Sequence, residues 1–420
     1  MVVFFFLKMP IGFAMMLLGV VGVAYVISVN AGFSLLGGDN FANFSDYNYT
    51  AFPMFIFSGS LAFATGLGNR LFDGFYILLR RVPGSLVIAS IAGCAGFAAI
   101  CGSSTATAAT MAKVAIPEMK KYGYDDSIAT ASIAVAGTLG PLIPPSNVFI
   151  FYGVFTGNSI GKLFVAGILP GILIAFLLAA TAIIMCIRNP SLAPIGPPAT
   201  RQKIINGTIG LVETIVLFGV VIGGMFLGWF TPTQGGAALS AAVFVLGIAR
   251  RQLTLKAVLA AAKETAVITC MIMVIIAGGI IFNRFIAATN IPYAAANAIT
   301  AAHLSPMIVM IIIILFYVIT GFFMDAMGVL ILTLPIFYPI VINLGYDPIW
   351  FGVIICLVGM TAVITPPVAV NLYVLQAVSK VPMSVITKGV WPFLGALLLG
   401  IILLLVFPQI ATVLTGFMTY

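Results

Sequence analysis

The sequence predicts an all-α polytopic membrane protein, an inverted repeat with two re-entrant helical hairpins and two broken helices. Composition is the first reason. Hydrophobic residues make up 62% of the 420 residues, charged residues only 7%, and mean hydropathy is +1.23, whereas a soluble domain carries roughly 25% charged residues. The chain has room for roughly ten spans of about 20 residues. Helices are the expected spans, because each helix satisfies its own backbone hydrogen bonds.

The second reason is a repeated set of backbone landmarks. Gly123-Tyr124-Asp125 and Pro144-Pro145 return as Gly345-Tyr346-Asp347 and Pro366-Pro367, and one shift of 222 residues (345 − 123 and 366 − 144) relates both pairs. Glycine and proline specify backbone shape more than surface chemistry. The landmarks therefore predict one backbone design used twice, as in transporters made of structural repeats.

The first repeat is expected at residues 1–187. Its N-terminal stretch is too long and too rich in glycine for a cleaved signal peptide, and is expected to be the first span. The predicted elements are scaffold helices within 1–67, a hairpin at about 85–119 with its tip at Gly102–Thr105, a broken helix at 126–157 and a helix at 163–187.

A polar, proline-rich cytoplasmic linker is expected at 188–206, and the second repeat at 207–420. The predicted elements are helices within 207–282, a hairpin at about 304–342 broken near Thr320-Gly321, a broken helix at 349–378 and a helix at 389–408.

The loop charges predict how these elements cross the membrane. Cytoplasmic loops of membrane proteins carry an excess of Lys and Arg. We therefore take the net charge of +8 as a guide to membrane topology and not as a sign of nucleic-acid binding. The basic candidates are Arg80-Arg81, Lys120-Lys121, Arg188 to Lys203, Arg250 to Lys256, and Lys380 with Lys388. The resulting path has a cytoplasmic N-terminus, an outward-facing loop at 38–50 and hairpins entering from opposite sides, as an inverted repeat requires.

The proline breaks are the expected place for chemistry. Proline has no N–H and disfavours helix in the residue before it, so LGPLIPPSN at 139–147 and GMTAVITPPVAVN at 359–371 must leave carbonyls without helical partners. Carbonyls beside hydroxyl groups make an oxygen cage suited to a hard cation such as Na⁺. The second half of each hairpin begins with exposed N–H groups, which suit a carboxylate.

Several polar and charged residues in or near apolar stretches have a structural explanation beside, or in place of, a functional one. Asp325 is the only acid well inside an apolar hairpin; it either contacts substrate or caps a broken helix. Lys113 and Glu118 are expected to be an ordinary pair near the membrane edge. Arg284 either contacts an anion or anchors its helix at the interface. The two Gly-Tyr-Asp motifs are expected to be turns whose aspartates cap the next helix.

The motifs together resemble the large membrane subunit (M, DctM-type) of TRAP transporters, the tripartite ATP-independent periplasmic systems. The resemblance covers essentially the whole chain, and its matching stretches are GSSTATAATMAKVAIPEMKKYGYD, GTLGPLIPPS, GGMFLGWFTPTQGGA, LTLPIFYPIVINLGYDPIWFGV and ITPPVAVNLYV. Many family members carry an acid where this chain has Gln234.

The resemblance implies an elevator mechanism driven by Na⁺, and uptake of an organic acid of the sialic acid or C4-dicarboxylate type. It also implies a periplasmic substrate-binding protein (P), a small membrane subunit (Q) and the bacterial inner membrane. The implied Na⁺ ligands are Ser103, Gly140, Ile143 and Pro145 at one site, and Gly321, Gly359, Ala362 and Thr365 at the other. The implied substrate-binding residues are Ser104, Asn147, Asp325 and Asn371.

Other functions are less well supported by the sequence. A stand-alone Na⁺/anion symporter of similar fold remains an alternative. An intramembrane enzyme is disfavoured, because Asp325 has no second acid at its depth and the single histidine, His303, offers no Ser–His pair. A channel is disfavoured by the lack of a charged ring or repeated filter strand.

Overall fold

The computed structural model describes Phe4, Leu7 and residues 9–194, 201–291, 293–294, 304–324 and 326–418, and within them every regular element is a helix. This agrees with the all-α fold class. Six of the described helices are long and apolar enough to cross a bilayer, or seven if α4 and α5 count as one bent span. The remaining apolar helices have 10–17 residues, which is shorter than a full crossing needs.

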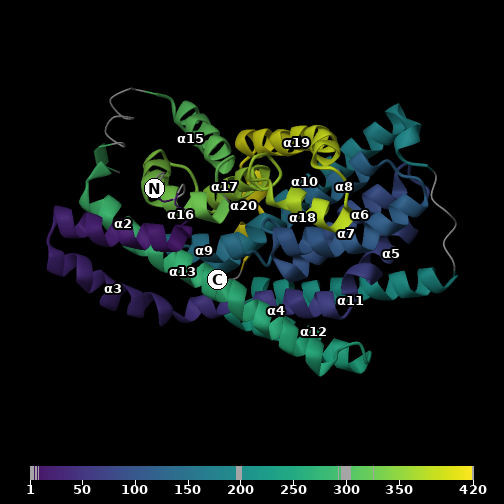
Figure 1. The fold of residues 1–420 in the computed structure, drawn as a ribbon, viewed down its shortest axis with the longest axis horizontal. Helices are drawn as coiled ribbons and strands as arrows, with labels where there is room; N and C mark the ends of the chain where they lie inside the picture. The colour runs from purple at the N-terminus through teal and green to yellow at the C-terminus, as the bar shows by residue number, and fades with distance from the viewer. Residues whose placement is uncertain are drawn as a thin grey trace.

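One layer of helices, called the scaffold layer here, is built from helices near the start of the chain and from helices in its middle (Figure 1). Helices α2 and α4 pack on α13, α12 packs on α4, and α11 packs on α5. The members of the layer are α2 (Ile11–Val26), α3 (Val29–Phe44), α4 (Ala51–Ala64), α5 (Leu67–Leu79), α11 (Arg201–Phe226), α12 (Pro232–Ala249) and α13 (Leu255–Ala288). Small residues allow the close crossings, as where a Cβ on Gly278 would lie 2.0 Å from the Gly12 carbonyl oxygen.

The scaffold layer differs from the sequence prediction in two places. Helix α3 begins well before the outward-facing loop expected at 38–50 and extends into it, and the short helix η1 (Tyr47–Thr50) occupies its end. The chain also bends by 70° after α4 and continues as α5, where a single helix ending near residue 67 was expected. Gly66, at φ +64°, forms the bend. Ser28 starts α3 by accepting a hydrogen bond from the Ala31 N–H at 3.2 Å, so a local cap outweighs the polar composition of this segment.

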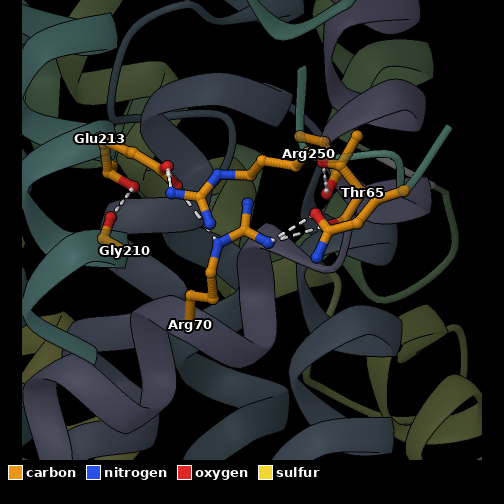
Figure 2. A network of polar contacts seen from close by, with 8 residues as sticks. Thr65, Arg70, Gly210, Glu213 and Arg250 are labelled. Carbon is orange, nitrogen blue, oxygen red and sulfur yellow. Dashed lines mark hydrogen bonds and ion pairs between the residues drawn. The ribbon is translucent and has the colours of Figure 1, made fainter. Parts of the chain in front are cut away.

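A buried ion-pair network holds α5 to α11 and to the end of α12 (Figure 2). The guanidinium of Arg70, only 8% exposed, donates to Glu213 Oε2 at 3.2 Å and to the Thr65 carbonyl and Gln252 Oε1 at 2.9 Å. The other carboxylate oxygen of Glu213 pairs with Arg250. One carboxylate therefore serves two arginines, which fixes the junction of three scaffold helices.

The two hairpins form the core of the second layer. Hairpin 1 consists of α6 (Ser85–Cys101) and α7 (Ser104–Lys121), and hairpin 2 of α15 (Pro306–Gly321) and α16 (Ala326–Asn343). Both turns fall within or beside the breaks expected from the sequence. Hairpin 1 packs on α4 and α5 of the scaffold layer, whereas α16 of hairpin 2 packs on α13.

Each hairpin is followed by a broken helix and a long helix. The first set is α8 (Asp126–Ala136) with η2 (Gly137–Leu139), α9 (Asn147–Thr156) and α10 (Ile160–Arg188). The second set is α17 (Pro348–Ala362), α18 (Val370–Ser379) and α19 (Met383–Val406). Short helices η3 (Pro190–Leu192), α20 (Gln409–Thr412) and η4 (Leu414–Phe417) complete the described elements.

The helix bounds themselves recur with the 222-residue shift. Helix α7, at 104–121, shifts to 326–343, which are the bounds of α16, and the start of α8 at 126 shifts to the start of α17 at 348. The Gly-Tyr-Asp turns agree as well. Asp125 accepts a hydrogen bond from the Ser127 N–H and Asp347 from the Trp350 N–H, both at 2.8 Å. The prediction that these aspartates cap helices is therefore confirmed.

Candidate functional site

The tip of hairpin 1 is pressed against the first proline break. Gly102 turns the chain at φ +63°, and a Cβ at this glycine would lie 2.4 Å from the Pro145 carbonyl oxygen. A Cβ at Gly140 would likewise lie 2.7 Å from the Ser103 carbonyl oxygen. Only glycine permits both approaches. Ser103, Gly140 and Pro145, three of the expected Na⁺ ligands, therefore meet at one place.

Two serines begin the helices that leave this place. Ser103 Oγ accepts a hydrogen bond from the Ala106 N–H at 3.4 Å at the start of α7. Ser146 Oγ accepts from the Phe149 N–H at 3.2 Å at the start of α9 and donates to the Pro141 carbonyl oxygen. Asn147, half-buried, is the first residue of α9. The positive ends of two helix dipoles thus lie beside the break, which favours a negative charge there.

The break also leaves backbone oxygens available. Among the described residues, no hydrogen-bond donor reaches the carbonyls of Gly140, Ile143 or Pro145, and all three residues are buried. The side chain of Ile143 packs on Gly171 of α10, so only its backbone could serve an ion. Buried carbonyls normally have partners. These are hard oxygen donors of the kind that alkali and alkaline-earth cations take.

Asn371 joins the hairpin 1 tip to the second break. It is fully buried, and its Nδ2 donates to Ser104 Oγ at 2.9 Å and to the Ala134 carbonyl oxygen at 2.8 Å. Two of the expected substrate-binding residues, Ser104 and Asn371, are therefore hydrogen-bonded to each other. They lie 267 positions apart in the sequence.

The other expected Na⁺ ligands form a second cluster where hairpin 2 meets α17. A Cβ on Gly321 would lie 2.7 Å from the Cβ of Ala362, and one on Gly359 would lie 2.9 Å from that of Ala326. Thr365, at the following break, donates its hydroxyl to the Thr361 carbonyl at 2.5 Å. The two breaks differ in exposure, because Pro144 and Pro145 are buried whereas Pro366 and Pro367 are exposed.

The remaining candidates are placed as follows. Asp325 lies outside the described residues. Arg284 pairs with Asp39 of α3 at 3.0 Å, so it joins two scaffold helices. No group of three or more His, Cys, Asp or Glu side chains able to hold a metal occurs in the described ranges.

Two contacts at the first break had no signal in the sequence. The carbonyl of Ala134 accepts from Asn371, and Cys356 Sγ donates to the Pro141 carbonyl at 3.1 Å. An alanine and a cysteine in apolar helices carry no pattern that marks them for such roles. They were identified only from the packing of α8 and α17 in three dimensions.

A family model now decides the classification. Residues 1–410 match the description "Tripartite ATP-independent periplasmic transporter, DctM component". The chain belongs to the DctM family. It is a polytopic large permease subunit of a TRAP transporter, and not an enzyme.

Curated DctM-type relatives differ in the substrate that their names give. The chain is 32% identical over 373 residues to the C4-dicarboxylate TRAP transporter large permease protein DctM of Pseudomonas aeruginosa, covering 89% of this chain and 87% of that one. It is 29% identical over 406 residues to the sialic acid permease protein SiaM of Vibrio cholerae, covering 96% and 94%. It is 33% identical over 362 residues to the ectoine/5-hydroxyectoine permease protein UehC of Ruegeria pomeroyi, covering 86% and 84%.

A solved structure supports the fold of this DctM-family chain. The YdaH transporter of Alcanivorax borkumensis superposes with a TM-score of 0.59 over 92% of this chain and 89% of its own, at 16% sequence identity. At that identity the likeness concerns the fold alone.

Proposed function

We propose that this DctM-family subunit couples organic acid import to Na⁺ and works by an elevator mechanism. The observation that carries the proposal is the junction of the hairpin 1 tip with the first proline break. There, buried carbonyls that no donor in the described ranges reaches lie beside the starts of α7 and α9. Oxygen donors bind the cation, and helix N-termini attract the carboxylate of the substrate. Opposite charges held a few ångströms apart stabilise each other, so each ligand raises the affinity for the other.

The first Na⁺ site consists of Ser103 with the carbonyls of Gly140, Ile143 and Pro145. The second consists of Gly321, Gly359, Ala362 and Thr365. The substrate lies between the hairpin tips, against Ser104, Asn147, Asp325 and Asn371. The contact between Gly321 and Ala362, and the hydrogen bond between Ser104 and Asn371, support this assignment.

The mobile body comprises the two hairpins and the two broken helices, and the scaffold layer stays fixed in the membrane. The correspondence of α7 with α16 and of α8 with α17 supports two repeats. The repeats are inverted, with hairpin 1 entering from the cytoplasm and hairpin 2 from the periplasm. Basic residues at the end of α7, Lys120 and Lys121, support a cytoplasmic position for that end and for the N-terminus.

The subunit works with a small membrane subunit and a periplasmic substrate-binding protein in the inner membrane. The substrate is an organic acid of the sialic acid or C4-dicarboxylate type, by analogy with the named relatives. A stand-alone Na⁺/anion symporter is the alternative that the test must separate.

Uptake of radiolabelled carboxylates into proteoliposomes tests the proposal. The permease with its small subunit should accumulate substrate only when an inward Na⁺ gradient and the binding protein are both present. Matched vesicles with K⁺ in place of Na⁺ serve as the control. Equal uptake with K⁺ would refute Na⁺ coupling, and full uptake without the binding protein would establish the stand-alone alternative.

A further inference from the structure

A cavity of about 140 Å³, with a mostly apolar lining that includes four polar side chains, lies between hairpin 1 and the scaffold layer. Neither Ser104 nor Asn371 is among its lining residues. Its polar lining comes from three helices: Ser60 of α4, Thr110 and Lys113 of α7, and Glu264 of α13. Lys113 lies about 14 Å along α7 from the hairpin tip at Ser104 (113 − 104 residues at about 1.5 Å each). The lining also includes Ala106, two residues after Ser104, so the cavity extends along α7 from beside the hairpin tip to Lys113.

The two charged side chains of this cavity do not neutralise each other. In the described part of the chain no ion pair joins Lys113 to Glu264. The Lys113 ammonium lies over the ring of Phe63, 4.8 Å from its centroid. Both residues are exposed in the structure, so their charges are open to a ligand that enters the cavity.

The hydrogen-bonding capacity of the polar lining side chains limits which ligands could bind in the cavity. Thr110 Oγ1 donates to the Ala106 carbonyl at 2.7 Å, so towards the cavity it can only accept. Ser60 can donate or accept, Lys113 donates, and Glu264 accepts. A ligand that fits this set has one carboxylate for Lys113 and hydrogen-bond donors for Glu264 and Thr110.

We propose that this cavity is a second substrate subsite, which binds a monocarboxylate carrying hydroxyl or ammonium groups on its way from the hairpin tips. The carboxylate pairs with Lys113, and a hydroxyl or ammonium group donates to Glu264. A dicarboxylate fits less well, because its second carboxylate would face the negative charge of Glu264. The inference rests on the proposed import of organic acids, and within that class it selects the hydroxylated monocarboxylates.

Ligand-induced thermal stabilisation of the purified permease with its small subunit is the measurement, since a ligand that binds the folded state raises the melting temperature. D-gluconate, with one carboxylate and five hydroxyls, is compared with succinate, which has two carboxylates and no donor. The wild-type protein should bind gluconate more tightly. Lys113→Met should weaken the binding of both about tenfold or more, as expected for loss of a charge-assisted hydrogen bond.

Substitutions at Glu264 give the sharper test. Glu264→Gln should weaken gluconate and strengthen succinate, and Glu264→Lys should reverse the preference between the two. Lys256→Met, on the exposed start of α13, is the matched control and should change neither. If Lys113→Met does not yield folded protein, Lys113→Gln takes its place.

Three outcomes would overturn the subsite. Unchanged affinities in the Lys113 and Glu264 variants would exclude it. A wild-type preference for succinate would exclude the monocarboxylate assignment. Equal changes in gluconate and succinate affinity in Glu264→Lys would show that this carboxylate does not select between the two ligands. Any of these results with intact Na⁺-driven uptake would leave the proposed function standing, whereas absence of wild-type uptake would remove the proposed function itself.

Discussion

Gly140→Ala is expected to separate the hairpin 1 tip from the first proline break. The added Cβ would lie 2.6 Å from the Ser103 carbonyl carbon, 2.7 Å from its oxygen and 2.9 Å from the Ser104 nitrogen. These are backbone atoms, which cannot rotate away as a side chain would. Restoring ordinary contact at 3.4 Å from the nearest of these atoms, at 2.6 Å, requires a displacement of about 0.8 Å. Overpacking of this kind costs about 1–3 kcal/mol. The φ of −52° at Gly140 is open to alanine, so the effect comes from contact alone.

If the ion-bound state needs this contact, the cost lowers Na⁺ affinity. At about 1.4 kcal/mol per tenfold, 1–3 kcal/mol corresponds to a rise of about 5–150-fold in the Na⁺ concentration for half-maximal uptake. The assay is uptake into proteoliposomes at varied external Na⁺ and saturating substrate. The matched control is Gly395→Ala in α19, where an added Cβ meets nothing within 4 Å.

The reasoning would be refuted by one clear result. If Gly140→Ala keeps the wild-type Na⁺ dependence while its melting temperature falls, the contact serves packing and not the ion. An unchanged melting temperature and Na⁺ dependence would mean that the tip does not approach the break this closely.

Three further predictions concern single polar groups. Ser103→Ala should raise the Na⁺ concentration for half-maximal uptake, because it removes an oxygen from the first proposed site. Asn371→Ala should cost about 2 kcal/mol of stability and reduce uptake, because it removes the hydrogen bonds that join the second break to Ser104 at the hairpin 1 tip and to Ala134 of α8. Glu213→Ala should cost about 3–5 kcal/mol, measured as a lower melting temperature, because it leaves Arg70 buried without its carboxylate.

Each of these predictions has its own check. Unaltered Na⁺ dependence in Ser103→Ala would reduce this serine to a helix cap. Ser127→Ala, at the capped start of α8, is a matched serine control. Wild-type uptake in Asn371→Ala would exclude Asn371 from the substrate site. For Glu213→Ala, adding Arg70→Met should recover part of the lost stability; no recovery would show that the network in Figure 2 is not the cause.

Much of the fold could be predicted from local signals. Proline without an N–H and glycine at positive φ determine where helices must stop, so the breaks after residue 139 and around Gly102 were visible in the sequence. Aspartate after Gly-Tyr predicted the caps of α8 and α17. Helix α3 was missed because its polar composition resembles a loop. Helix α5, beyond the bend at Gly66, was missed because Asn69, Arg70 and Asp73 interrupt the apolar run.

The candidate site was only partly accessible from the sequence. Composition and family resemblance indicated Ser103 and the carbonyls near Pro145. The partners of Asn371 could not be predicted, because Ala134 lies 237 positions away and contributes only a backbone oxygen. Lys113 was assigned to Glu118 by spacing along one helix, whereas its ring partner, Phe63, comes from a different layer.

The sequence by itself therefore determined that this protein lies in a membrane, that its backbone design is repeated, and where its helices are broken. These properties depend on hydropathy and on backbone dihedral preferences, which act over a few residues. The tertiary structure decided which break meets which hairpin, which carbonyls keep no donor and which charges share a cavity. Those properties depend on the approach of helices far apart in the chain, and close approach is decided by shape complementarity that no local pattern records.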